Sequence, residues 1–143
     1  MKIIKSFAPS NLTDWRGWLA KNHDHEQEVW LVYFKPVSGK TNIDYEGSVE
    51  EALCFGWIDS IIQQIDDEKY ARKFNPRRME SKWSKTNKRR AVKVIREGRM
   101  TEAGDEISSD VLIFNLLQCT LKHLIGLCAH NRITVVDHIG WHA

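Results

Sequence analysis

The chain has 143 residues, of which 42% are hydrophobic and 10% aromatic, and its formal net charge is +2. This length is typical of one domain with its own core, and eight glycines, three prolines and six tryptophans exclude a disordered or collagen-like chain. Residues 71–100 contain 12 Lys and Arg against two Asp and Glu, whereas the remaining residues contain 9 against 17, which predicts either an anionic partner or internal ion pairs.

Two elements are predicted before residue 40. Ser10 or Asn11 is the expected cap of a short helix whose apolar side chains fall on one side, namely Leu12, Trp15, Trp18 and Leu19. Residues 29–34, with the sequence VWLVYF, are too short for a helix and indicate a buried strand. Residues 36–40 form the turn that follows it.

A helix and a hairpin are predicted next. Ser48 and Glu51 fit a capping box for a helix that Gly56 ends. Residues 57–65 and 70–74 are strand-like and flank an acidic turn, which indicates an antiparallel hairpin.

The basic stretch contains the last clear helix. Ser84 is the expected cap of a helix that runs to about Glu97, with an apolar face made by Ala91, Val92 and Ile95. Thr101 opens another short helix. This order of elements predicts an α+β fold, in which an antiparallel sheet is flanked by helices.

We expect the α+β domain to span residues 1–107 and a helical, apolar extension to span residues 108–143. The apolar region of this extension is interrupted by polar side chains, so no membrane span is expected. Its apolar residues would cover most sides of a helix, and we therefore expect a homodimer formed through it.

The amino-terminal residues and the cysteines favour a reduced, cytoplasmic protein. The first 15 residues lack the apolar region of a secretory signal. The chain has three cysteines, Cys54, Cys119 and Cys128, which cannot all pair within one chain. None of them lies in a C-x-x-C motif. Cys54 lies between Leu53 and Phe55 and is expected to be a core thiol.

The basic stretch is the candidate anion site, for a small anionic ligand or a nucleic acid. Adjacent guanidinium groups suit a two-pronged grip on phosphate or carboxylate, Ser84 places a helix N-terminus nearby, and Phe74 and Trp83 suit stacking on a base or sugar. The alternative is a solvated helix face whose cations pair with the acidic remainder of the chain. The candidate residues are Arg77, Arg78, Lys82, Lys85, Lys88 and Arg89.

A candidate cleft is centred on Asp59, which enters an otherwise apolar strand. Because a lone buried carboxylate is costly, we expect Arg77 or Arg78 to pair with it. The other interpretation is a small enzyme in which this acid and a guanidinium perform general acid–base work. The cleft candidates are Trp57, Asp59, Trp83 and Asn87.

Histidines occur at positions 23, 25, 123, 130, 138 and 142, but their spacings do not match a zinc site. The sequence also contains no phosphate-binding glycine motif and no nucleophile motif. We therefore expect no metal and no cofactor.

Several blocks between residues 14 and 107 resemble the bacteriocin-protection, YdeI/OmpD-associated (OmdA) family. The longest is VEEALCFGWID at residues 49–59, and PRR at residues 76–78 is followed by SKWS at residues 81–84 and GRMT at residues 98–101. The other blocks are Trp18-Leu19, Asn22-His23, Val29–Val32, Tyr45, Phe74, Asn87 and Ala103-Gly104. Beyond Ile107 the sequence departs from the family, which either a variant tail or a change of reading frame explains.

The resemblance implies a cytoplasmic bacterial protein linked to protection against bacteriocins or to envelope stress. It carries over no catalytic residue. Together with the basic stretch, it predicts a protein that acts by binding an anionic partner through a basic surface, with the small enzyme as the alternative.

Overall fold

The computed structural model describes residue 3, residues 5–107 and residues 111 and 117. The chain divides into two compact units, Met1–Ser108 and Ser109–Ala143. The extension predicted over residues 108–143, and the dimer expected through it, lie outside the described residues except for positions 111 and 117. The elements of the first unit are β1 (Ser6–Phe7), α1 (Leu12–Asn22), β2 (Val29–Phe34), the 3-10 turn η1 (Pro36–Ser38), α2 (Tyr45–Cys54), β3 (Trp57–Gln64), β4 (Lys69–Pro76), α3 (Lys85–Arg96) and α4 (Glu102–Ile107).

The first unit has an α+β fold, as predicted, built on one four-stranded sheet with the order β1-β2-β4-β3. β4 pairs antiparallel with both of its neighbours, and β3 and β4 form the predicted hairpin. The sheet is mixed, because β1 pairs parallel with β2. Among the described residues, no helix is both long enough and apolar enough to cross a membrane.

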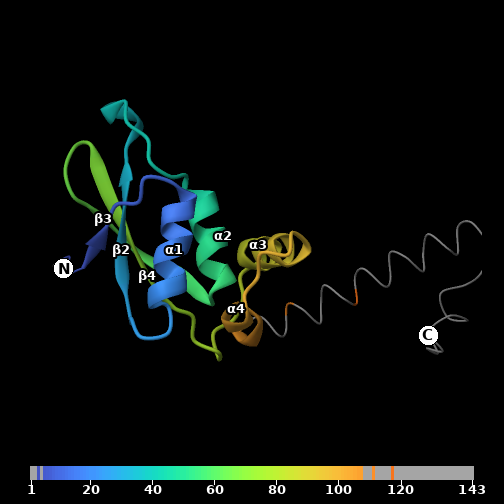
Figure 1. Ribbon diagram of the computed structural model, residues 1–143. Coiled ribbons are helices and arrows are strands. Elements are labelled where there is room, and N and C mark those ends of the chain that lie inside the picture. Colours follow the sequence, from blue (N-terminus) through green and yellow to red (C-terminus); the bar gives the residue numbers. More distant parts are fainter. Residues whose placement is uncertain (1–2, 4, 108–110, 112–116, 118–143) are drawn as a thin grey trace, which may run out of the picture. The chain divides into compact units, whose positions relative to one another are not determined.

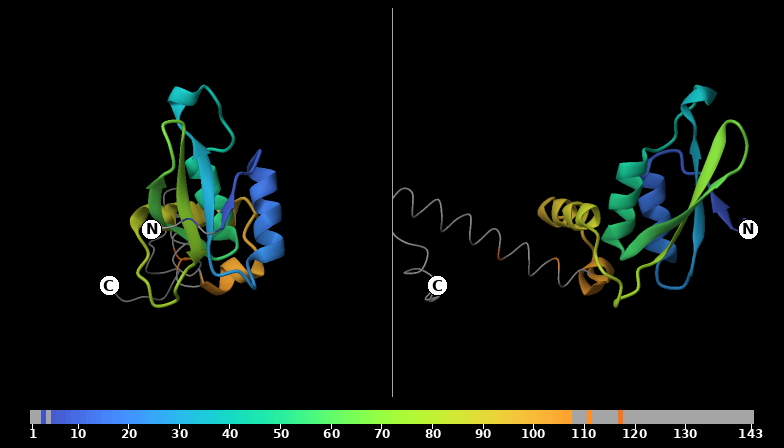
Figure 2. Two further views of the ribbon diagram at one scale, coloured as in Figure 1. Left: turned by 90° about the vertical axis from the view of Figure 1, so that its left-hand side faces the viewer. Right: turned by 180° about the vertical axis from the view of Figure 1, so that it is seen from behind.

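Helices α1 and α2 lie side by side over one face of the sheet, and α3 and α4 pack beyond α2 (Figures 1 and 2). Between the sheet and this first helical layer lies the hydrophobic core. Each element contributes side chains at its own period, every second residue on a strand and every third or fourth on a helix. The largest fully buried side chains here are Trp15, Leu19, Val29, Leu31, Tyr33, Val49, Leu53, Trp57 and Phe74.

Helix α2 starts earlier than its expected capping box. Asp44 is the N-cap, and its carboxylate accepts a hydrogen bond of 2.7 Å from the backbone N–H of Gly47. Ser48 is instead fully buried, and its hydroxyl is 2.6 Å from the hydroxyl of Tyr33. The prediction that Ser48 begins the helix is therefore wrong, because an aspartate four residues earlier provides a cap with the same chemistry.

Helix α3 is capped by Ser84, as predicted, and its hydroxyl accepts from the N–H of Asn87 at 3.1 Å. Gly98 ends it with a φ of 69°, a left-handed conformation that glycine adopts without strain. Ala91 and Val94 are its buried residues, so that Val94 takes the central position on the apolar face that we expected for Val92.

Candidate functional site

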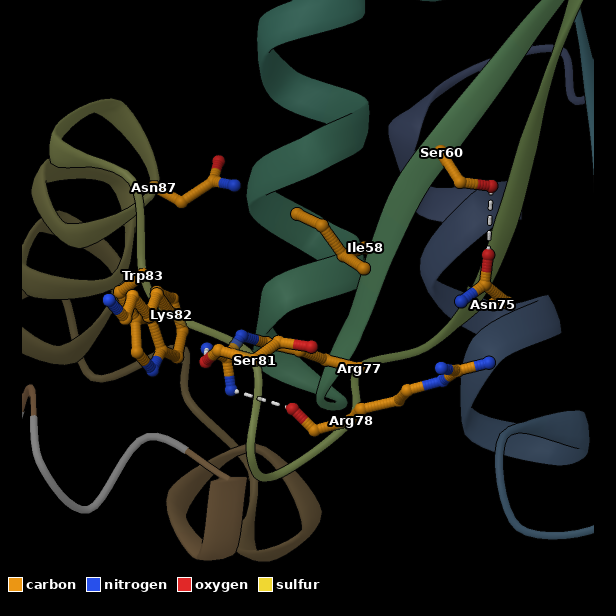
Figure 3. Close-up of a pocket in the computed structure, with 9 residues that line it drawn as sticks. All are labelled: Ile58, Ser60, Asn75, Arg77, Arg78, Ser81, Lys82, Trp83 and Asn87. Atoms are coloured by element: carbon orange, nitrogen blue, oxygen red, sulfur yellow. Dashed lines mark hydrogen bonds between the residues drawn. The ribbon is translucent and has the colours of Figure 1, made fainter.

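A hollow of about 420 Å³ lies between the start of β3 and the start of α3 (Figure 3). We call it the α3 hollow. It collects side chains from β3, from the end of β4, from the loop at residues 77–84 and from α3. The lining residues are Ile58, Ser60, Asn75, Arg77, Arg78, Ser81, Lys82, Trp83 and Asn87.

The α3 hollow combines an apolar surface with hydrogen-bonding groups. Ile58 is its apolar side chain from β3, and the hydroxyl of Ser60 donates to Asn75 Oδ1 at 2.9 Å. On the opposite side, Asn87 Oδ1 accepts a hydrogen bond of 2.7 Å from Arg90. This bond orients the amide of Asn87, whose nitrogen is turned toward Ile58 in Figure 3. The amide nitrogen is thus presented as a donor.

Arg77 supports the wall of the α3 hollow. Arg77 is only 8% exposed, and its guanidinium lies over the ring of Trp83, 4.1 Å from the ring centroid. It also donates to the backbone carbonyls of Arg78, at 3.2 Å, and of Ser81. Arg77 therefore holds the loop closed and positions Trp83, and the expectation that Arg77 and Arg78 form an exposed guanidinium pair is wrong.

Arg78 and Lys82 are exposed cations of this loop. Within the described part of the chain, neither has an ion-pair partner. The side chain of Arg78 points away from Trp83 (Figure 3), and Arg78 also lines a second hollow of about 460 Å³. This hollow shares Asn75, Arg77 and Arg78 with the first, and we call the two together the basic groove. The other residues that line the second hollow are Gln27, Glu28, Lys73 and Pro76.

Other cations of the basic stretch pair with acids of the same domain. Arg90 contacts Glu46 through two nitrogens, each at 2.7 Å, and Lys93 contacts Glu50 at 2.7 Å. The hydrogen bond to Arg90 lowers the pKa of Glu46. The alternative interpretation of the charge asymmetry is therefore confirmed for these cations.

Three of the predicted anion-binding residues lie away from the basic groove. Lys85, Lys88 and Arg89 are exposed on α3 and line neither hollow. The helical period directs these side chains to the outer surface of α3, because Ala91 and Val94 occupy its buried side.

Asp59 belongs to a different cluster from the one we predicted. Its carboxylate accepts hydrogen bonds from the hydroxyl of Tyr45 at 2.9 Å and from Arg72 Nη1 at 3.2 Å. The guanidinium of Arg72 also lies 4.1 Å from the centroid of the Tyr45 ring. The expected pairing of Asp59 with Arg77 or Arg78 is wrong. Burial and the hydrogen bond to Asp59 raise the pKa of Tyr45.

The four cleft candidates are divided between the groove and the interior. Trp83 and Asn87 line the α3 hollow, whereas Trp57 and Asp59 line neither hollow. Trp57 is 1% exposed, and its indole N–H donates to the carbonyl of His23 at 3.3 Å. None of the described residues that line the α3 hollow is acidic.

Cys54 is a buried free thiol, as predicted, and burial raises its pKa. Among the described residues, no three His, Cys, Asp or Glu side chains form a cluster suited to a metal ion. Cys119, Cys128 and the histidines at 130, 138 and 142 lie outside the described residues.

Replacing Asp59 with alanine is expected to lower the free energy of unfolding by about 2–3 kcal/mol. The side chains of Asp59 and Arg72 are 15% and 26% exposed, so the substitution leaves a largely buried guanidinium without its carboxylate. Urea unfolding followed by tryptophan fluorescence measures the change. A Tyr45→Phe variant removes one hydrogen bond only and should lose less; an equal loss in both variants would contradict the ion pair as the main contribution.

The sequence model of one protein family, described as a domain of unknown function (DUF8412), matches residues 7–107. The chain belongs to this family. No curated protein and no solved structure matches the chain. The DUF8412 match ends with α4 and includes every described residue that lines the basic groove.

Proposed function

We propose that the DUF8412 domain of this chain binds an anionic partner in the basic groove. The observation that carries the proposal is the contrast between two groups of cations. Arg72, Lys73, Arg90, Lys93 and Arg99 each contact a carboxylate of the domain. Arg78 and Lys82 line a hollow and have no such partner in the described residues. Cations beside a hollow without an internal counter-charge favour an external anion.

The chemistry of the α3 hollow favours a phosphate or carboxylate attached to a planar or apolar group. Lys82 and Arg78 supply positive charge, and the amide nitrogen of Asn87 supplies a donor. The N-terminus of α3, which Ser84 caps, adds the positive end of the helix dipole. Trp83, held by Arg77, and Ile58 offer surface to a ring such as a base or sugar.

A short single-stranded oligonucleotide is the first probe, because it combines phosphates with stacking bases. Binding is expected to weaken steeply between low and moderate salt as condensed counterions are released. Fluorescence anisotropy of a labelled strand measures the affinity and the salt slope. Inorganic pyrophosphate, used as a competitor, tests whether phosphate alone is recognised.

Reversing the charges of Arg78 and Lys82 to glutamate is expected to weaken oligonucleotide binding by at least about tenfold and to flatten the salt slope by about one to two. Folding should change little, because both side chains are exposed and unpaired in the described residues. Reversal of Lys85 and Arg89, which line neither hollow, is the matched control with the same change of net charge. Equal weakening in the two variants would contradict the groove as the binding site.

We also propose that the protein acts in the cytoplasm and protects against bacteriocins or envelope stress. Two observations support this proposal, namely the resemblance of residues 14–107 to the OmdA family and the free thiol of Cys54. A strain without the gene should survive bacteriocin treatment less well, and the wild-type gene, but not the Arg78/Lys82 reversal, should restore survival. Restoration by the reversal variant would separate protection from the groove.

A further inference from the structure

We propose that two copies of this chain form a symmetric dimer by pairing their β3 strands edge to edge. In this dimer the acidic β3–β4 turn of each copy reaches the α3 hollow of the other. The second half of this inference rests on the proposed function, because it assigns the carboxylates of the turn as anions for the same cations.

Strand β3 is an edge of the sheet, and in the described part of the chain no strand pairs with its outer side. Its second half exposes Ile61 and Ile62, which are 41% and 56% exposed, and Ile65, directly after the strand, is 42% exposed. Residues 60–65, SIIQQI, contain no charge and no proline. Edge strands are normally protected from pairing by charged side chains, proline or a β-bulge. The first two are missing from residues 60–65, and the register shift of β3 lies between Asp59 and Ile62, before the centre of the proposed pairing at Gln63.

The same segment of a second copy is a suitable occupant of this edge. A partner strand must be extended, uncharged and partly apolar to cover Ile61 and Ile62 without burying a lone charge. Residues 60–65 of a second copy meet these requirements. Antiparallel pairing of a strand with itself is two-fold symmetric, so both copies bury the same surface and the assembly closes as a dimer.

Charge complementarity supports this arrangement. If two β3 strands pair antiparallel about Gln63, Gln64, the last residue of β3, lies opposite Ile62 of the other copy, and the turn that follows continues toward Ser60 of that copy. Ser60 lines the α3 hollow together with Lys82. The acidic turn would therefore lie beside unpaired cations.

The β3–β4 turn has a fixed backbone and exposes acidic side chains. Asp66 accepts hydrogen bonds of 2.8 Å from the N–H groups of Glu68 and Lys69, which fixes the turn. Asp67 and Glu68 are exposed and have no ion-pair partner among the described residues. These two carboxylates remain for the second copy, so an external anion and the dimer compete for the α3 hollow.

Sedimentation velocity of the full chain over a range of concentrations tests the edge. We expect a monomer–dimer equilibrium whose dissociation constant rises at least tenfold in the Ile62→Lys variant, because lysine on an edge strand opposes pairing. Val37→Lys is the matched control, since Val37 is 78% exposed and lies in η1 after β2. A full-length chain that is monomeric throughout, or a dimer equally stable in Ile62→Lys, would overturn the proposal; the latter result would place the interface elsewhere, such as in residues 108–143.

A charge exchange tests the turn. Reversing Asp67 and Glu68 to lysine should weaken the dimer, and so should reversing Arg78 and Lys82 to glutamate, whereas combining the two reversals should restore it. Failure of the combination to restore the dimer would overturn the contact between turn and hollow. Oligonucleotide binding by Ile62→Lys distinguishes the two proposals. If this variant binds the oligonucleotide while the wild type does not dimerise, only the dimer proposal fails. If the dimer forms as described but neither the oligonucleotide nor pyrophosphate binds, the proposed function fails.

Discussion

Replacing Arg99 with alanine is expected to lower the free energy of unfolding by about 2–4 kcal/mol. Arg99 donates to Glu51 at 2.6 Å and to Glu50 at 3.3 Å, and these glutamate side chains are only 9% and 6% exposed. Without Arg99, two buried carboxylates on α2 lose a shared counter-charge, and their desolvation is no longer offset. Urea unfolding at neutral pH measures the loss.

Arg99 keeps its positive charge in the folded protein. Burial alone would lower its pKa, but hydrogen bonds to Glu97 and Glu51 outweigh this effect and raise the pKa above its ordinary value. Lys93→Ala is the informative control, because Lys93 contacts the same Glu50 at 2.7 Å but its side chain is 55% exposed. Water screens that pair, so we expect little change. If Lys93→Ala were as destabilising as Arg99→Ala, burial would not be the reason for the effect.

Replacing Trp15 with alanine is expected to cost about 3–5 kcal/mol of unfolding free energy. Trp15 is fully buried, stacks on Trp18 with a centroid distance of 5.5 Å and meets the edge of Phe74 at 5.3 Å. Its indole N–H donates to the carbonyl of Ser48 at 2.9 Å, which joins α1 to α2. The alanine variant removes the ring contacts and this hydrogen bond together and leaves a cavity. Thermal unfolding followed by circular dichroism measures the loss.

Trp15→Phe separates these contributions. Phenylalanine keeps one aromatic ring but lacks the N–H and the second ring of the indole, so we expect this variant to lose about 2–3 kcal/mol, from the unpaired carbonyl of Ser48 and from a smaller cavity. A loss in Trp15→Phe as large as in Trp15→Ala would assign the effect to the N–H and the second indole ring, which both variants lack, and not to the ring that phenylalanine keeps. A loss below about 1 kcal/mol in Trp15→Ala would show that the core closes over the cavity.

Local sequence signals predicted the elements well where the signal lay inside the element. Residues 29–34 were predicted as a strand with the observed ends, because charged residues flank an unbroken apolar run on both sides. Strand β1 was missed, because two residues show no periodicity and its pairing depends on Trp30, far along the chain. The predicted start of helix α2 was four residues too late, because two acceptable cap residues, Asp44 and Ser48, occur four residues apart.

The candidate site was predicted in composition but not in its contacts. Arg78, Lys82, Trp83 and Asn87 do line one hollow, since they belong to one loop and the helix that follows it. Arg77 could not be separated from Arg78 by sequence, because its burial depends on how the loop folds back onto Trp83.

The partner of Asp59 depends on sheet register. Asp59 lies opposite Phe74, and the register shifts between Asp59 and Ile62, where Ile62 lies opposite Arg72. A bulge brings Arg72 to the carboxylate, and the sequence contains no local signal for a bulge at this position.

The position of α2 has a consequence for how the protein is made. Its residues 47–54 are all buried, and its two buried glutamates pair with Lys93, Arg99 and the Arg16 side chain of α1. The C-terminal end of α2 is closed by Thr101, whose N–H donates to the carbonyl of Cys54 at 3.0 Å. During translation, Lys93, Arg99 and Thr101 are synthesised after all the strands of the sheet. A nascent chain that ends before α3 therefore exposes the acidic outer side of α2 to water, and the domain reaches its stable form only when its last two helices have been synthesised.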